Sequence, residues 1–388
     1  MRAAIAAVLL VVASVFAACP AFAFDLGEWV PGLKLSPFLS ERVEYETNIF
    51  QVPSHSTDDV VFKTIPGFVV DYTFGAHSLT AGYRAEILNY FSLTDQDTTH
   101  HIAAGQLRLD FPRTLLILRE DFVRTSDPPS TELTGRILSN TNTLRPSAEY
   151  RLTPRFSTGL LYSWIHQRFD DKSIGDLIDR DEHLVVTSVF WKFIPQADVG
   201  LNYGIGRTVF VTSDRDYTRH QITISLRGDI SPKLSSSFRA GWEIRDPDNS
   251  HEEHGSGFFM GGDFTYRPTE RTFITLTADR SIQESTFETT TFYTTTAAQL
   301  AVQHQLLPKV SIAARLGGGM NDYSSKETVG NKTDFRKDWF MAAGASVDYD
   351  IQRWLRIGVE YLRTSRTSNF APFEFVDDRF TGRVTLQF

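Results

Sequence analysis

Apolar and polar side chains alternate with a period of two through almost the whole chain, and this alternation constrains the fold more than any other feature. From Phe380 to Phe388, one face carries Phe, Gly, Val, Leu and Phe, and the other carries Thr, Arg, Thr and Gln. Ser236–Arg245, Val310–Met320 and Leu79–Ile87 alternate in the same way, whereas no window shows a convincing helical stripe. The pattern predicts an all-β protein.

The length of the alternating runs distinguishes a transmembrane β-barrel from a soluble β-sandwich. The runs are about ten to fourteen residues long, whereas strands of soluble sandwiches usually have about five or six. A tilted strand that crosses a bilayer needs about 9–11 residues. No apolar run after residue 20 is long enough for a transmembrane helix. We therefore predict a single antiparallel transmembrane β-barrel.

Composition excludes two other classes. The chain of 388 residues is 41% hydrophobic and 13% aromatic, which is too apolar for a wholly disordered protein. Its formal net charge is −8, so the chain lacks the excess of basic residues that binds phosphates, and we expect no nucleic-acid partner.

The first 23 residues have the features of a secretory signal peptide. Arg2 precedes an apolar stretch, and Ala21-Phe22-Ala23 supplies the small residues of a cleavage site. We expect residues 1–23 to be removed and residues 24–388 to form the barrel. A membrane anchor and lipidation at Cys19 are the alternatives, but the apolar stretch is short and Phe16 stands where a lipobox usually has Leu.

Short turns and long polar segments alternate along the mature chain. The predicted turns are Gly75-Ala76, Pro112-Arg113, Thr153-Pro154-Arg155, Ile194-Pro195-Gln196, Ser231-Pro232-Lys233, Pro268-Thr269-Glu270, Leu307-Pro308-Lys309 and Ile351-Gln352-Arg353. The predicted long loops are Glu46–Asp59, Thr125–Thr134, Asp170–Asp181, Asp246–Gly255, Ser285–Phe292, Asp322–Asp334 and Ser365–Asp377. Short periplasmic turns opposite long extracellular loops are typical of outer-membrane barrels. Counting runs between breaks predicts about 18 strands, within a range of 16–18, from Lys34–Tyr45 to Asp378–Phe388.

A sheet survives in hydrocarbon only without free edges, so the first and last strands must pair. An even strand number then leaves both termini on the periplasmic side of the outer membrane of a Gram-negative bacterium. Phe388, Leu386 and Val384 resemble the C-terminal signal of the outer-membrane assembly machinery. The expected partners are this machinery, outer-membrane lipid and lipopolysaccharide.

A barrel of this size is too wide for side chains to fill, which leaves an aqueous lumen. Sixteen charged residues fall on the polar face of their strands and are our candidates for pore lining. They are Arg42, Glu44, Arg84, Glu86, Arg108, Asp110, Arg145, Glu149, Arg227, Arg239, Glu243, Asp263, Arg315, Arg356, Glu360 and Arg383. They either brace a hydrated wall or screen solutes by charge, and their balanced signs predict neither anion nor cation selectivity.

No motif predicts catalysis, a cofactor or a metal site. His251-Glu252-Glu253-His254 differs from the HExxH arrangement, and no helix is expected there to align its histidines. The spacing of Ser, His and Asp residues does not indicate a catalytic nucleophile paired with a base. We therefore expect no enzyme, no cofactor and no metal.

The segment Tyr45-Glu46-Thr47-Asn48-Ile49-Phe50, which closes the first predicted strand, resembles a motif of the Putative beta-barrel porin 2 family. The resemblance in layout covers essentially the whole mature chain. It implies an outer-membrane barrel, and an association with exopolysaccharide export or surface assembly.

Three functions remain open at this point. The first is a porin that passes hydrophilic solutes or an exported polysaccharide. The second is a non-conducting structural or adhesive barrel that binds a surface partner through its acidic loops. The third is a barrel enzyme that acts on lipid.

Overall fold

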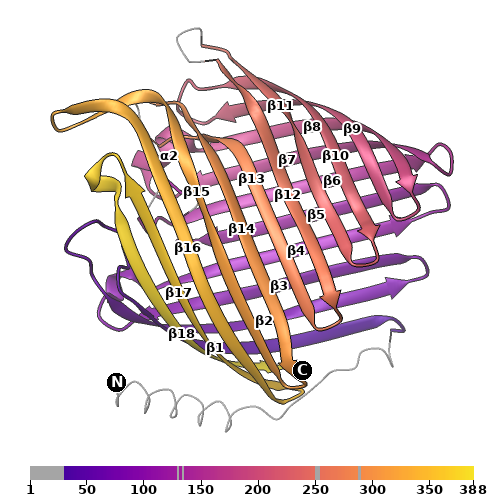
Figure 1. The fold of residues 1–388 in the computed structure, drawn as a ribbon, viewed down its shortest axis with the longest axis horizontal. Helices are drawn as coiled ribbons and strands as arrows, with labels where there is room; N and C mark the ends of the chain where they lie inside the picture. The colour runs from indigo at the N-terminus through magenta and orange to yellow at the C-terminus, as the bar shows by residue number, and fades with distance from the viewer. Residues whose placement is uncertain (1–29, 129–130, 133–134, 250–253, 287–289) are drawn as a thin grey trace.

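The computed structural model describes residues 30–128, 131–132, 135–249, 254–286 and 290–388. These residues form one antiparallel sheet of 18 strands, which is closed into a barrel (Figure 1). The predicted signal peptide, residues 1–23, lies outside the described residues. No helix among the described residues has the length and apolar composition needed to cross a membrane.

The strands follow one another around the barrel in chain order. They are β1 Leu33–Glu46, β2 Asp59–Phe74, β3 His77–Tyr90, β4 Thr98–Asp110, β5 Thr114–Thr125, β6 Ser139–Arg151, β7 Phe156–Phe169, β8 Arg180–Ile194, β9 Ala197–Phe210, β10 Tyr217–Ser231, β11 Leu234–Pro247, β12 Gly255–Thr269, β13 Thr272–Glu284, β14 Phe292–Leu307, β15 Val310–Val329, β16 Lys332–Gln352, β17 Leu355–Ser368 and β18 Phe375–Gln387. Within the described part of the chain, three short helices lie in loops: η2 Thr94–Gln96, α2 Lys172–Ile178 and η3 Ala371–Phe373.

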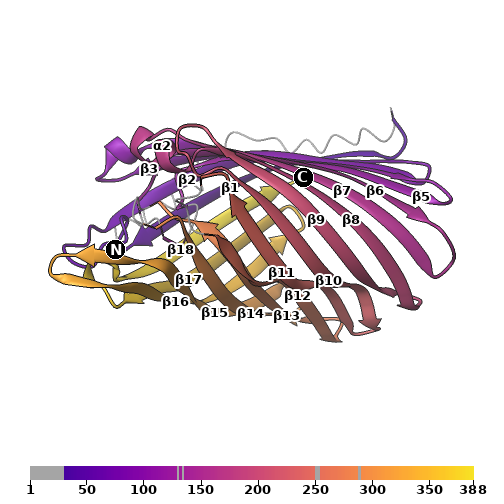
Figure 2. The ribbon, with the colours of Figure 1, turned by 90° about the horizontal axis from the view of Figure 1, so that it is seen from above.

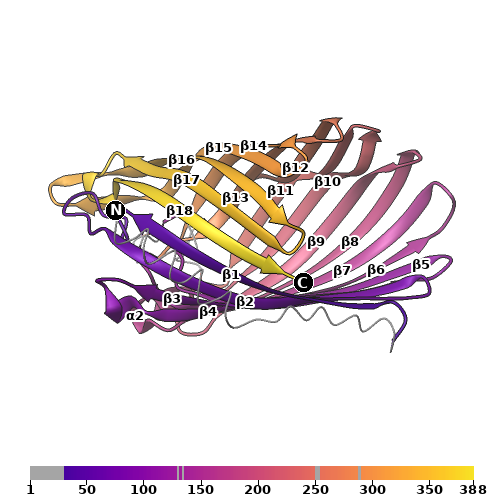
Figure 3. The same ribbon diagram turned by 90° about the horizontal axis from the view of Figure 1, so that it is seen from below.

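The first and last strands close the sheet. β1 pairs with β18 from Phe38 opposite Gln387 to Glu46 opposite Arg379, and it pairs with β2 on its other side. The backbone amide of Phe388 donates to Pro37 at 3.0 Å, which extends the seam to the last residue. Figure 3 shows β1 beside β18, and Figure 2 shows the barrel from the opposite side. The predicted class, an antiparallel barrel of about 18 strands, is confirmed.

The two ends of the barrel differ as predicted. Eight connections of two to four residues lie at one end, where β1 begins and β18 finishes. The other end carries the longer connections, with one exception. We predicted a loop at Asp322–Asp334, but β15 continues to Val329 and β16 begins at Lys332. The result is a long hairpin that projects beyond the neighbouring strands (Figure 1).

The outer surface carries an apolar band between two rows of aromatic residues. Near the short turns, Tyr150, Trp191, Tyr266 and Tyr349 are exposed, each within three residues of its strand end. Toward the loops, three tyrosine hydroxyls each meet a histidine Nδ1 on the next strand, at 2.7–2.9 Å. The pairs are Tyr83–His101, Tyr162–His183 and Tyr203–His220.

The distance between these rows matches a membrane. The three histidines lie nine to eleven residues from the turn end of their strands. At about 3.4 Å per residue and a tilt of about 40°, ten residues rise by about 25 Å, which is the height of an outer-membrane apolar band. Amphipathic rings with polar tips suit the two membrane interfaces.

Neighbouring residues on β15 face opposite sides of the wall. Leu316 is 57% exposed on the outside, among other exposed apolar residues. Ala313 and Arg315 lie on the inner face, where they line a cavity with residues of β14, β16 and β17. This alternation makes the two faces separately testable.

We expect Leu316→Arg to impair barrel assembly, because an arginine facing lipid costs about 2–4 kcal/mol near the midplane. Ala313→Arg is the matched control, since the same charge enters the hydrated inner face. The measurement is the yield of heat-modifiable barrel in outer-membrane fractions. Equal loss for both variants would contradict this assignment of faces.

Candidate functional site in the barrel lumen

The structure places all sixteen charged candidates on the inner face of their strands. On β3, β11 and β17, for example, the exposed apolar residues Tyr83, Trp242 and Val359 occupy the opposite face. The inner face is therefore charged on both walls of the barrel. Whether solutes pass along these residues stays a prediction.

Neighbouring inner-face charges pair along and between strands. Arg84 binds Glu86 at 2.8 Å, and Arg108 binds Asp110 at 2.9 Å, each two residues apart on one strand. Glu44 pairs with Lys63 of β2 at 2.8 Å rather than with Arg42. Of these three contacts, only the Glu44–Lys63 pair braces two neighbouring strands, whereas the other two lie along one strand.

A larger cluster braces β15 to β18. Arg383 binds Asp348 at 2.6 Å and Glu360 at 3.3 Å, and Arg315 binds Glu360 from the other side at 2.5 Å. Arg356 pairs with Asp350 at 2.6 Å nearer the short turns. Arg315 is 43% exposed at its side chain, so this cluster is hydrated on the lumen side.

One ion pair connects strands that are four places apart in the sheet. Arg227 of β10 binds Glu149 of β6 at 2.9 Å, and it also binds Asp198 at 3.2 Å. Its guanidinium lies 3.6 Å from the ring centre of Phe190 on β8. Because β6 and β10 are four strands apart, this contact shows that the inner faces of these strands approach each other.

The β5–β6 loop, of which residues 126–128, 131–132 and 135–138 are described, folds inward at the end with long loops. Arg366 of β17 donates to the backbone carbonyls of Thr131 at 2.8 Å and Glu132 at 3.2 Å. Thr131 also hydrogen-bonds Asn321 of β15, and Arg136 pairs with Glu46 of β1 at 2.9 Å. The loop therefore reaches from β5 and β6 to the opposite wall, across the lumen.

Glu132 anchors the loop to the β13–β14 connection. Its carboxylate accepts hydrogen bonds from the backbone and hydroxyl of Thr286, at 2.7 and 2.8 Å, and from Ser285 at 2.8 Å. Burial nevertheless raises the pKa of Glu132, because removal from water disfavours the ionised form more than these donors favour it. The buried position of Glu132 therefore favours its protonated form more than water does.

Buried charges surround the docked loop. Arg336 of β16 is fully buried, pairs with Asp338 at 2.6 Å and packs its guanidinium against the rings of Phe373 and Tyr323. Burial raises the pKa of nearby Glu327, on the projecting part of β15. The loop end of the lumen is therefore packed with paired polar groups.

The β1–β2 loop also packs inward, at the motif singled out in the sequence. The side chain of Asn48 bonds the backbone at Val52 and Val376, and this holds the chain in a tight turn. Ile49 then packs in a buried apolar cluster with Val61, Leu88 and Tyr90. The motif residues Asn48 and Ile49 thus fix a loop inside the barrel mouth.

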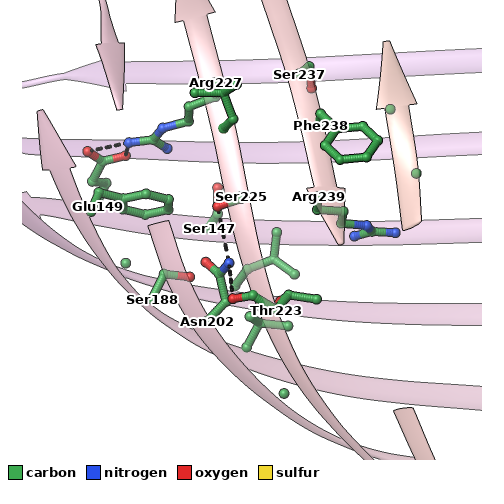
Figure 4. A pocket seen from close by; sticks show the side chains of 18 of the residues that line it. Ser147, Glu149, Ser188, Asn202, Thr223, Ser225, Arg227, Ser237, Phe238 and Arg239 are labelled. Atoms are coloured by element: carbon green, nitrogen blue, oxygen red, sulfur yellow. Dashed lines mark hydrogen bonds and ion pairs between the residues drawn. The ribbon is translucent and has the colours of Figure 1, made fainter. Parts of the chain in front are cut away.

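Below the inserted loops the inner wall is hollow. A cavity of about 630 Å³ runs along the inner faces of β5 to β13. In Figure 4, Asn202 reaches Thr223 and Ser225, and Arg227 meets Glu149, while Arg239 stands apart from both groups. A second cavity of about 280 Å³ is lined by β13 to β17. The lumen is therefore filled at the loop end and open in its middle.

Sequence reasoning missed the residues that hold the loop. Glu132, Arg136, Arg336 and Arg366 were not among the candidates. Glu132 lies in Thr125–Thr134 and Arg366 in Ser365–Asp377, which were predicted as ordinary long loops. No alternation or motif distinguishes an inserted loop from a solvated one. Within the described ranges, no group of three or more His, Cys, Asp or Glu residues could hold a metal ion.

Several solved structures are similar to this chain at low sequence identity, and one of them is described as an outer membrane protein. The Pseudomonas aeruginosa protein OpdK is 12% identical, with a TM-score of 0.46, and the match covers 92% of this chain and 99% of that one. OccAB3 of Acinetobacter baumannii is 10% identical, with a TM-score of 0.47 and coverage of 92% and 100%. OccK11 (OpdR) of Pseudomonas aeruginosa is 13% identical, with a TM-score of 0.48 and coverage of 91% and 96%.

No curated protein matches the sequence significantly. The family assignment rests instead on the Putative beta-barrel porin 2 family, which matches residues 26–183 and 207–388. The two matched segments cover most of the barrel and include both strands of its closing seam. The chain belongs to the Putative beta-barrel porin 2 family, and it is a porin-like barrel of the Gram-negative outer membrane.

Proposed function

We propose that the protein is a passive channel for small hydrophilic solutes, narrowed at its loop end by the inserted β5–β6 loop. The observation that carries the proposal is the contrast within the lumen. The middle of the barrel keeps a cavity of about 630 Å³ with charged, partly exposed walls, and only the loop end is packed. A barrel without a transport role has no need for a hydrated interior behind a docked loop.

Small solutes fit this arrangement better than an exported polysaccharide. A polymer has to thread past the docked residues Thr131, Glu132 and Arg136 over its whole length, so the loop has to stay undocked during export. A small solute needs only a brief displacement of the loop. Charged side chains on both walls also screen single solutes by charge as they pass.

A non-conducting barrel is the second candidate, and one observation favours it. The loop is held by Arg366, by Arg136 and by three donors to Glu132, which is a firm attachment for a gate. Single-channel recording in planar bilayers separates the two functions. Stepwise conductance supports the channel, and a silent bilayer at high protein load supports the structural or adhesive barrel.

The proposed orientation follows the two ends of the barrel. The short turns and both strand termini face the periplasm, and the long loops face outward. In this orientation the tyrosine–histidine pairs lie at the outer interface, beside lipopolysaccharide. The assembly machinery would recognise the last strand through Val384, Leu386 and Phe388.

We expect Arg366→Ala to increase single-channel conductance, because it removes both hydrogen bonds to the loop backbone and leaves the β17 wall in place. Arg363→Ala is the matched control. Arg363 lies on the outer face of the same strand, paired with Asp378 at 3.1 Å. Conductance of the Arg366 variant equal to that of the control would show that the docked loop does not limit the path.

We expect acidification to close the channel through Glu132. The pKa of Glu132 is raised in the docked loop above its ordinary value near 4.5, so docking takes up a proton. The stabilisation of the docked loop is complete below about pH 4.5 and is lost as the pH rises through the raised pKa.

The measurement is open probability between pH 7 and pH 4. Glu132→Gln should flatten this pH profile and hold the open probability at pH 7 near the acidic value of the wild type. A variant that retains the wild-type pH profile would assign the titration to another group.

A further inference from the structure

A proline interrupts the strand ladder of the barrel wall between β6 and β7. The register of these two strands is the same above and below the interruption. Two opposite positions in between lack a ladder pair, although both strands are described throughout: Arg145 with Ser163, and Pro146 with Tyr162. The wall is therefore locally unpaired.

The missing amide proton of Pro146 explains the interruption. Successive residues of a strand point their N–H groups to alternate neighbours. The N–H of Arg151 donates to Arg113 on the β5 side, so Pro146, an odd number of residues away on the same strand, faces β7. Proline has no N–H, so the carbonyl of Tyr162 receives no ladder hydrogen bond from it. Separating the two strands here breaks fewer hydrogen bonds than at a fully paired stretch.

Cavities lie on both sides of the wall at this point. On the lumen side is the cavity of about 630 Å³, which we call the mid-lumen cavity. On the lipid side is a hollow of about 410 Å³, the outer hollow, whose apolar lining from β4 to β6 includes Leu107, Leu116, Leu118 and Pro146. A single layer of residues separates the two, because the same four line both: Ile117, Ser147, Ala148 and Leu160.

The interruption lies at membrane depth. Pro146 is five residues from Arg151, where β6 ends at the short turns. That is about half of the roughly ten residues that span an outer-membrane apolar band. Leu116, Leu118 and Leu160 are exposed around the outer hollow. The outer hollow therefore faces hydrocarbon, so alkyl chains have direct access to it.

The lumen side of the same wall is also apolar. The apolar lining from β5, β7 and β8 consists of Leu115, Ile117, Leu161 and Val186, among others. Lumen faces of such barrels are usually polar. Hydrated solutes do not need this apolar surface, whereas an alkyl chain packs on it. Amide and hydroxyl groups elsewhere in the lining, from Asn202, Thr223 and Ser225, suit a polar head.

A layer of buried ion pairs lies between the mid-lumen cavity and the long loops. Arg245 of β11 binds Glu243 and Glu284 of β13, each at 2.6 Å. Glu182 of β8 binds Arg219 of β10 at 3.4 Å. Moving one of these groups aside leaves a buried charge unpaired. A solute in the cavity thus meets a firmer barrier toward the loops than between β6 and β7.

We propose that the wall at Pro146 is a lateral portal between the mid-lumen cavity and the outer hollow, for amphiphiles with a single alkyl chain. The chain lies along the apolar lumen wall and passes between β6 and β7 where no ladder pair has to break. The polar head stays with the amide and hydroxyl groups until the chain has entered the bilayer. This activity goes beyond the proposed channel for hydrophilic solutes and does not require the β5–β6 loop to undock.

Photolabelling from the lipid side tests the portal. The full chain is reconstituted in vesicles of phosphatidylethanolamine and phosphatidylglycerol that contain 1-dodecanol with a diazirine at its chain end. The neutral head of this probe excludes attraction by the arginines of the lumen. After illumination, mass spectrometry should find adducts at lipid-facing Leu118 and Leu160, and also at lumen-facing Ile117 and Leu161.

Restoring the ladder should close the portal. Pro146→Ala supplies the missing N–H, so the adducts at Ile117 and Leu161 should fall about tenfold, the factor that one net hydrogen bond contributes. Pro66→Ala is the matched control. The described strands β2 and β3 lack a ladder pair at Pro66 in the same way, but they line neither cavity. This variant should leave the lumen adducts unchanged.

A disulfide across the interruption gives a reversible closure. Arg145→Cys with Ser163→Cys joins the strands at one of the unpaired positions. The single cysteine of the sequence, Cys19, lies in the predicted signal peptide. The oxidised variant should lose the lumen adducts, and reduction should restore them. Thr141→Cys with Gln167→Cys, at a paired position nearer the loops, should keep them in both forms.

The outcomes separate the portal from the channel proposal. Absence of adducts at Ile117 and Leu161 in wild-type barrel, or their persistence in the oxidised lock at Arg145 and Ser163, overturns the portal. Equal lumen adducts in the two proline variants overturn the role of Pro146. Lumen adducts in a barrel that is silent in planar bilayers support the portal while refuting the channel, and conductance without lumen adducts does the reverse. All variants are compared only after each shows the heat-modifiable mobility of folded barrel.

Discussion

Backbone hydrogen bonding in hydrocarbon is the constraint on which the rest of the structure depends. Each unpaired amide or carbonyl there costs several kcal/mol, so the sheet must close on itself. The seam from Phe38–Gln387 to Glu46–Arg379 meets this requirement. Closure in turn gives every strand one face toward lipid and one toward the lumen. Within the membrane, charged side chains then favour the lumen face, and above the membrane they appear on any face.

That same constraint explains how far the sequence could predict the fold. Within the membrane, lipid forces strict alternation, and the proline-containing turns mark where it stops. Above the membrane neither face meets lipid, so Asp322–Asp334 was predicted as a loop although it continues as paired strands. β2 alternates poorly for a different reason. Its inner-face residues Val61 and Ile65 are apolar, and Val61 packs against Ile49 of an inserted loop.

Of the side-chain contacts in the lumen, only those between residues close in sequence could be predicted. Arg84–Glu86 and Arg108–Asp110 follow from spacing, since residues two apart on a strand share a face. The contacts that shape the interior join distant segments, as Arg227 does with Glu149 and Glu132 does with Ser285. These pairs depend on the path of a loop and on which walls approach each other. Period-two alternation carries no information about either.

The energetics of the two halves of the lumen differ in a way that favours a movable loop on a fixed wall. Arg336 and Asp338 are fully buried on one strand, and separating them would leave a buried charge unpaired, at a cost of about 3–5 kcal/mol. The wall beneath the loop therefore stays intact when the loop moves.

The loop itself is held by single contacts, such as the bonds from Arg366 to two carbonyls, and water replaces these when the loop undocks. Each such bond contributes about 1.5–3 kcal/mol at most when one group is charged. The entropy cost of ordering a loop of 13 residues offsets a few bonds of this size. The free-energy difference between the docked and the undocked loop is therefore small, and a single proton on Glu132 can shift it.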